Sequence, residues 1–195
     1  MALHAVGRFV KRTLILLLSL VAALALVTVV LGKLFSGPRH AGPASDHFDG
    51  TTFRNLRPVE HGGWRDFVRW QLNRQRGAWE NRATPPGQRP VDRVGKGELT
   101  VTFINHATVL IQQDGLNILT DPIWSERASP VAWVGPRRYH PPGINFDDLP
   151  RIDAVVISHN HYDHMDVPTL RRLKRGRTFV GLGNAAFLKG ATDLD

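Results

Sequence analysis

The 195-residue sequence contains no cysteine. A disulfide framework, a thiolate metal ligand and a cysteine nucleophile are therefore excluded.

Acidic residues are absent before Asp46, and the stretch from Leu14 to Leu31 carries no charge at all. A helix over that stretch would be roughly 27 Å long at about 1.5 Å per residue, which nearly spans the hydrocarbon core of a bilayer. The apolar run is longer than that of a signal peptide, and no clear cleavage site follows it. We expect a transmembrane anchor over residues 13–35, with a cleaved signal as the alternative.

The basic segment 1–12 should stay in the cytoplasm by the positive-inside rule. The sequence then describes a single-pass membrane protein with the bulk of its chain on the outer, periplasmic side. Of the net charge of +8, residues 33–95 supply 11 basic against 6 acidic side chains, whereas residues 96–195 hold 11 of each. A basic excess near the membrane suits anionic lipid headgroups at least as well as nucleic acid. We expect membrane phospholipid as the partner and no nucleic acid.

Residues 36–63 have the composition of a linker, with Gly-Pro pairs among polar residues. Residues 64–98 are predicted to form a basic, aromatic helix from Trp64 to Trp79, followed by a proline-rich connection. The aromatic face of this helix has two interpretations. It packs against a neighbouring part of the protein, or it lies on the bilayer with its rings among the headgroups.

Residue 99 begins a pattern of period two. Leu99, Val101 and Phe103 alternate with threonines, which predicts a half-buried strand. Asp114-Gly115 then separates two further apolar runs, and this pair suits the positive φ values of a tight hairpin turn.

A continuous apolar run, Ala154–Ile157, predicts a strand that is buried on both faces. Asp166 can cap the helix that follows, because Pro168 lies in its first turn. Leu170 and Leu173 would form the buried side of that helix.

Between this strand and this helix, three of the nine histidines fall within the six residues His159-Asn160-His161-Tyr162-Asp163-His164. Residues two apart in an extended loop project to the same side, so His159 and His161 can share one ion. Asp163 and His164, past the bend, can reach a second ion. Four such groups placed together without a cation would be poorly compensated. The motif therefore predicts a metal site with a position left open for water.

This motif resembles the His-x-His-x-Asp-His signature of the metallo-β-lactamase superfamily. Within it the chain is similar to the N-acylphosphatidylethanolamine phospholipase D-like, or RomA-like, branch. The narrower resemblance begins at Asn105-His106-Ala107-Thr108-Val109, where Asn105 replaces the usual glycine. It continues through the long loop, in Leu119 to Ile123, Ser125 to Pro130 and Gly135 to Arg138, and through the segment from Ile152 to Asp166. It covers roughly residues 55–190.

The resemblance implies an α+β fold, the metallo-β-lactamase αββα sandwich, preceded by one transmembrane helix. Residues 99–195 would be the N-terminal half of that sandwich. The resemblance also implies two zinc ions per complete active site. The metal ligands would be His159, His161, Asp163 and His164, of which Asp163 and His164 would be the catalytic residues.

Enzymes of this superfamily supply a third histidine, a bridging aspartate and a final histidine from later segments. This sequence has no histidine after His164, and Asp193 and Asp195 are the only carboxylates beyond Asp166. Half of the sandwich would also leave one sheet face uncovered. We therefore expect a truncated product that is inactive as this chain.

In the complete enzyme, the two ions would lower the pKa of a water molecule and polarise a phosphoryl oxygen for attack on a phosphodiester. The resemblance implies N-acylphosphatidylethanolamine-like lipids as substrates. His106 and Asp121 are expected behind the ligands, where they would fix a histidine tautomer, with an ordinary role in a turn or strand as the alternative.

Trp124, Arg137 and Arg138 are expected to contact the acyl chain and clamp the phosphate, with packing of the long loop as the alternative. Two other functions stay open. One is a hydrolase of the same fold that acts on a lactone, a β-lactam or nucleic acid, and the other is a non-enzymatic, membrane-anchored module.

Overall fold

The computed structural model describes residues 2–34, 36–60, 62–75, 77, 87–173 and 176–192. It divides into two compact units, Met1–Gly37 and Pro38–Asp195. The first unit is helix α1 (Ala2–Leu34), of which Val6–Leu34 is long and apolar enough to cross a membrane. A signal sequence passes the same test of length and composition, so the anchor and its orientation stay predictions.

The segment predicted as a linker contains a small folded turn. Phe48 pairs with Ser45 and Phe53 through isolated β-bridges, and its ring lies 4.4 Å from that of Phe53. Phe48 is only 2% exposed. A bare tether is therefore the wrong description for residues 45–53, because an aromatic contact organises them.

Helix α2 (Trp64–Leu72) is shorter than the helix predicted from Trp64 to Trp79. Its start is fixed by Asp66, whose side chain accepts a hydrogen bond from the Gly63 N–H at 2.9 Å. None of its residues is buried. Trp79 and the prolines that follow lie outside the described residues.

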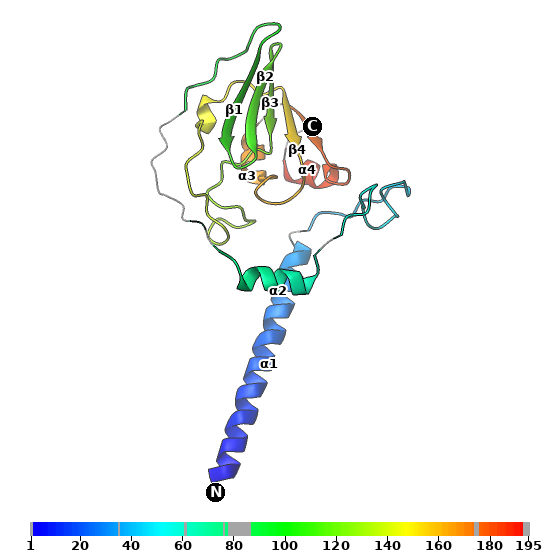
Figure 1. Ribbon diagram of the computed structural model, residues 1–195, viewed down its shortest axis with the longest axis vertical. Coiled ribbons are helices and arrows are strands. Elements are labelled where there is room, and N and C mark those ends of the chain that lie inside the picture. The colour runs from blue at the N-terminus through cyan, green and yellow to red at the C-terminus, as the bar shows by residue number, and fades with distance from the viewer. Residues whose placement is uncertain are drawn as a thin grey trace. The chain divides into compact units, whose positions relative to one another are not determined.

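Five strands form one mixed sheet in chain order. Figure 1 labels β1 to β4 side by side in that order. They are β1 (Leu99–Asn105), β2 (Thr108–Gln113), β3 (Leu116–Thr120), β4 (Ala154–Ile157) and β5 (Arg177–Val180). The first three pair antiparallel, and β3, β4 and β5 pair parallel. The hairpin predicted at Asp114-Gly115 is confirmed, with φ of 49° and 80° at the two positions. Since the chain reverses twice, β1, β3, β4 and β5 all run in the same direction.

Three short helices complete the second unit. The 3-10 turn η1 (Phe146–Asp148) lies in the long connection from β3 to β4, α3 (Val167–Arg172) connects β4 to β5, and α4 (Ala185–Ala191) follows β5. The buried side predicted for α3 is confirmed, because Leu170 and Leu173 are both in the core.

The core lies on one face of the sheet. Leu110, Leu119 and Val155 point into it and meet residues of α3 and α4. The other face is apolar but exposed. Val101 and Phe103 of β1 are 60% and 66% exposed, and Val156 of β4 and Phe179 of β5, which pair with each other, are exposed on the same face. The prediction that β4 is buried on both faces is therefore wrong. No part of the chain that the structure describes covers this second face, which agrees with the uncovered face that was expected.

Candidate metal centre

The predicted site residues lie at the carboxyl edge of the sheet. His106 follows β1, Asp121 follows β3, and the loop from Ser158 to Asp166 follows β4. Because these three strands run in the same direction, their ends bring together residues that are far apart in the sequence. The carboxyl edge of parallel strands is a common place for ligand sites in such sheets.

His106, Asp163 and His164 form a group whose potential ligand atoms all lie within 4.8 Å of one another. Asp163 Oδ2 is 3.0 Å from His106 Nε2 and 3.7 Å from His164 Nε2. Two imidazole nitrogens and one carboxylate oxygen are donors that zinc, iron and manganese accept. This donor set fits a divalent metal ion.

The other two predicted ligands stand beside this group. The ring centroid of His159 lies 4.0 Å from that of His164 and 4.5 Å from that of His161. The structure thus joins Asp163 and His164 to His106, which the sequence analysis had placed behind the ligands. His159 and His161 remain an adjacent pair, and the assignment of all four motif side chains to metal stays a prediction.

Asp121 contacts the opposite side of the His164 ring. Its Oδ2 accepts a hydrogen bond from His164 Nδ1 at 2.9 Å, and its two oxygens accept the N–H and the hydroxyl of Ser158 at 2.7 and 2.8 Å. Burial raises the pKa of Asp121, but the hydrogen bonds from His164 and Ser158 outweigh it and hold the pKa below its ordinary value. An ionised Asp121 keeps the Nδ1 proton on His164, which leaves Nε2 free to act as a ligand.

The backbone is strained at two of these positions. His106 has φ of 42° and Asp121 has φ of 36°, in the left-handed region that favours glycine. Neighbouring side chains hold both turns, since Thr108 Oγ1 donates to Asp121 O at 2.7 Å and Asn105 Nδ2 donates to Ile123 O at 3.1 Å. Backbone strain that neighbouring contacts maintain at the ends of two strands, both beside the candidate metal centre, is typical of a functional site.

A cavity of about 730 Å³ opens beside His106 and Asp163. Its walls include Phe103 and Ile104 of β1 and residues of the long loop between β3 and β4, from Ile123 to Gly143. The size is in the range of small-molecule sites. The metal donors therefore adjoin a space that a substrate can enter.

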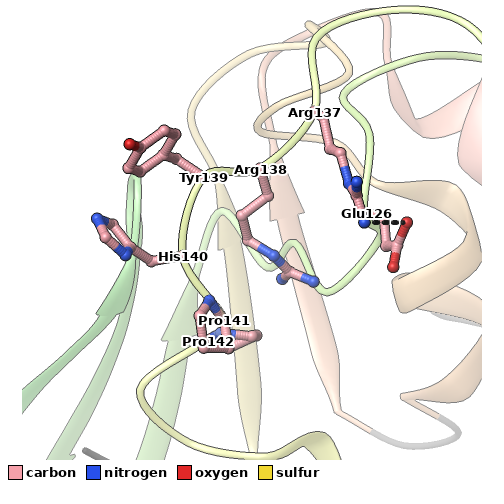
Figure 2. A pocket seen from close by; sticks show the side chains of 7 residues that line it. All are labelled: Glu126, Arg137, Arg138, Tyr139, His140, Pro141 and Pro142. Carbon is pink, nitrogen blue, oxygen red and sulfur yellow. Dashed lines mark ion pairs between the residues drawn. The ribbon is translucent and has the colours of Figure 1, made fainter. Parts of the chain in front are cut away.

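The three predicted substrate contacts differ in their placement. Trp124 is a packing residue, since its Nε1 donates to Ile144 O at 3.0 Å and its ring meets Phe146 edge-on. Arg137 forms an ion pair with Glu126 at 3.6 Å, and its side chain is 66% exposed. Arg138 leaves the loop on the same side, while Tyr139 and His140 leave on the other, as Figure 2 shows.

Two residues of the site were missed or assigned another role. Ser158 Oγ lies 2.9 Å from His159 Nδ1 and 3.3 Å from His164 Nδ1, and its place directly before the motif was the signal that could have found it. Asp166 is the N-cap residue of α3, as predicted, but its side chain forms no capping hydrogen bond with the helix backbone. That carboxylate accepts instead from Trp124 N, Ser125 N, Ser125 Oγ and Thr169 Oγ1.

Comparison with known proteins gives consistent matches. Residues 116–190 match the family described as Beta-lactamase superfamily domain. An uncharacterized protein of Mycobacterium tuberculosis is 42% identical over 120 residues, which are 61% of this chain and 31% of that protein. N-acyl-phosphatidylethanolamine-hydrolyzing phospholipase D 1 of Caenorhabditis elegans is 41% identical over 95 residues, which are 47% of this chain and 27% of that enzyme. Among solved structures, isothiocyanate hydrolase from Delia radicum gut bacteria aligns at a TM-score of 0.41 and 26% identity, over 49% of this chain and 38% of that chain.

The chain spans about three tenths of the length of each of these two curated relatives. The family match contains Asp121 and the whole metal motif, together with β3, β4, β5 and α3. The α+β architecture with its mixed sheet and one long, apolar N-terminal helix is the fold that the sequence predicted. Residues 116–190 thus match the beta-lactamase superfamily domain, and the chain is similar to the N-acylphosphatidylethanolamine phospholipase D-like branch of that superfamily.

Proposed function

We propose that this chain is part of a membrane-associated, metal-dependent hydrolase of the phospholipase D type, which cleaves N-acylphosphatidylethanolamine-like lipids. The observation that carries the proposal is the convergence of His106, Asp163 and His164 beside a cavity of about 730 Å³. The similarity to the Caenorhabditis elegans phospholipase D supports the substrate class.

Each side chain of the centre has a distinct role in this proposal. His106, Asp163 and His164 hold one metal ion, and His159 and His161 are donors for a second. A bound divalent metal lowers the pKa of a water molecule and polarises a phosphoryl oxygen. Asp121 fixes the tautomer and the orientation of His164. Zinc is the proposed metal, although the same donors accept iron or manganese.

The exposed surface of α2 supports a lipid environment. Trp64, Phe67 and Trp70 form an aromatic stripe, with ring centroids 5.5 and 6.0 Å apart, and Trp64 is 75% exposed. The Arg74 guanidinium lies 5.1 Å from the centre of the Trp70 ring. No residue in the described part of the chain buries this stripe, which favours the bilayer interpretation over internal packing. Aromatic rings with arginines beside them suit the headgroup region of an anionic bilayer.

The metal assignment is tested by elemental analysis of the full chain purified in a non-ionic detergent. We expect retained metal that is lost on His106→Ala/His164→Ala substitution. His47 is exposed and lies in the folded turn before α2, so His47→Ala is the matched control. A chain whose metal content equals that of the double variant would contradict the metal centre.

The reaction is tested with N-palmitoyl-phosphatidylethanolamine in vesicles, with the Caenorhabditis elegans enzyme as the positive control. Because the chain spans about three tenths of its relatives, the longest product of its gene is assayed beside it. Release of phosphatidic acid that a chelator abolishes would support the proposal. Hydrolysis of a lactone, a β-lactam or nucleic acid without any lipid turnover would contradict it.

A further inference from the structure

Two hydrogen bonds to the backbone fix Arg138 in the long loop. Its N–H donates to Glu126 O at 2.7 Å, and its Nη2 donates to Trp124 O at 3.0 Å. The segment that offers these acceptors is anchored in turn by Asp166, which accepts from the amides of Trp124 and Ser125. One main-chain acceptor, Trp124 O, therefore orients the guanidinium, and a second, Glu126 O, fixes the backbone of Arg138.

The other terminal nitrogen of this guanidinium, Nη1, is buried and has no acceptor among the residues that the structure describes. Burial lowers the pKa of Arg138, and the charges of Glu126 and Asp166 oppose that shift. A guanidinium nevertheless stays protonated at neutral pH. Arg138 thus presents a fixed positive charge with an unused hydrogen-bond donor, an arrangement that costs stability unless an acceptor arrives.

The two nearby carboxylates do not satisfy that donor. Glu126 forms its ion pair with Arg137. Asp166 directs one oxygen to the Ser125 hydroxyl at 2.8 Å and the other to the Ser125 amide at 3.0 Å and to Thr169 Oγ1 at 2.5 Å. Neither carboxylate therefore supplies an acceptor for Arg138 Nη1.

Arg138 lines the same cavity as the metal donors His106 and Asp163, together with the apolar side chains of Phe103 and Ile123. A fixed guanidinium and apolar walls suit a molecule that combines an oxyanion with hydrocarbon. We propose that Arg138 binds a phosphoryl oxygen of the substrate in this cavity. The inference rests on the proposed function, because it takes the cavity as the substrate site.

Arg137 supplies a matched control for this proposal. It is the neighbouring residue, lines the same cavity and carries the same charge, so the sequence analysis expected it to share in binding the phosphate. Its side chain, however, is exposed and already paired with Glu126. An exposed ion pair of this kind is screened by solvent. A purely electrostatic attraction of anions to the loop would depend on both arginines, whereas a built site depends on Arg138.

The test uses the full chain in non-ionic detergent micelles with a chelator present, so that no metal contributes. Inorganic phosphate and dihexanoylphosphatidic acid are titrated separately by calorimetry into the wild type and into R138Q, R138K and R137Q. We expect R138Q to bind the anion at least about tenfold more weakly, because a hydrogen bond between charged groups is lost. R137Q should stay within about twofold of the wild type.

If the lipid binds more tightly than phosphate, Arg138 belongs to a site for a lipid headgroup. If the two bind equally, Arg138 belongs to a general oxyanion site. Either result supports the proposal. Wild-type affinity in R138Q, or an equal loss in R137Q, would overturn the proposal. If R138Q fails to fold, the side-chain NMR signal of ¹⁵N-labelled Arg138 is followed in the wild type while the anion is added to saturation. A shift of that signal supports the site, and an unmoved signal overturns it. Because the chelator removes metal, this titration does not depend on the metal centre. A failure of the proposed metal centre would therefore appear in the elemental analysis and not in the anion titration.

Discussion

The Nδ1 atom of His164 lies 2.9 Å from Oδ2 of Asp121, although the two residues follow different strands. The opposite ring nitrogen, Nε2, faces Asp163 at 3.7 Å. One histidine therefore connects a buried carboxylate to an exposed metal-binding edge. Its two nitrogens have different partners, so its tautomer is set before any cation binds.

Asp121→Asn should weaken metal binding about 10- to 100-fold, because an amide no longer holds the Nδ1 proton of His164 by charge. Competition with a chromophoric chelator measures the affinity of the full chain. Asp147→Asn, which changes an exposed carboxylate, should leave the affinity as it is. Equal affinities in D121N and the wild type would contradict the role given to Asp121.

His106→Ala should lower the affinity for the first equivalent of metal at least about tenfold, since a neutral imidazole donor is lost. The converging group contains His106 and excludes His159 and His161. A combined His159→Ala/His161→Ala change should therefore remove the second equivalent before the first. If this double variant loses the first equivalent before the second, the tighter site is the pair His159 and His161, as the sequence analysis predicted.

Acid should lower the free energy of unfolding by protonating Asp153, which breaks its ion pair with Arg93. Arg93 donates to its two oxygens at 2.6 and 2.9 Å, and this hydrogen bonding, against the opposing effect of burial, lowers the pKa of Asp153 from 3.8. A lowered pKa means that the stabilisation is present above 3.8 and is lost as the pH falls through the folded-state pKa.

Asp153→Asn should accordingly cost about 1 kcal/mol at pH 7, a figure reduced for the partial exposure of Arg93. The difference from the wild type should shrink below about pH 4. Urea unfolding followed by tryptophan fluorescence at several pH values measures it. A difference that is as large at pH 3 as at pH 7 would show that charge on Asp153 contributes nothing.

Asp166→Ala should loosen the start of the long loop. Its buried carboxylate accepts hydrogen bonds from both Trp124 and Ser125, and their loss should cost about 2–3 kcal/mol. Hydrogen exchange of the Trp124 and Ser125 amides should accelerate. Glu126→Ala, in the same loop but exposed, should leave that exchange slow. Unchanged exchange in D166A would mean that other contacts hold the loop.

Trp64→Ala/Trp70→Ala should weaken the binding of residues 38–195, a compact unit of their own, to vesicles of phosphatidylcholine and phosphatidylglycerol. Two indole rings removed from a bilayer interface should lower the partition coefficient at least about tenfold. Trp133→Ala removes another exposed tryptophan and is the control. Equal losses in both variants would point to unspecific adsorption.

Local chemistry decided which elements could be predicted from the sequence. Asp114-Gly115 specifies its hairpin because few other pairs tolerate positive φ at both positions. The metal motif was equally visible, since its residues are adjacent in the chain. Pro168 and the leucines of α3 marked that helix in the same way.

Properties that depend on distant segments could not be predicted. The alternation in β1 has apolar residues on one side and threonines on the other, and it does not show that the apolar side, with Val101 and Phe103, is the exposed one. The contact between His106 and Asp163 depends on the shared direction of β1 and β4, which follows from strand order and not from periodicity. The role of Asp166 was hidden because its partners lie about 40 residues earlier.

The left-handed backbone at His106 sets stability against metal binding. Glycine at this position would relax the turn, and replacing a strained residue in this way typically gains about 1 kcal/mol. The same change would delete a metal donor. Asp121 has the same backbone geometry, but its carboxylate accepts hydrogen bonds from Ser158 and His164, and losing them would cost more than the turn gains. A thermostable variant selected by melting temperature alone would therefore tend to discard His106 and retain Asp121.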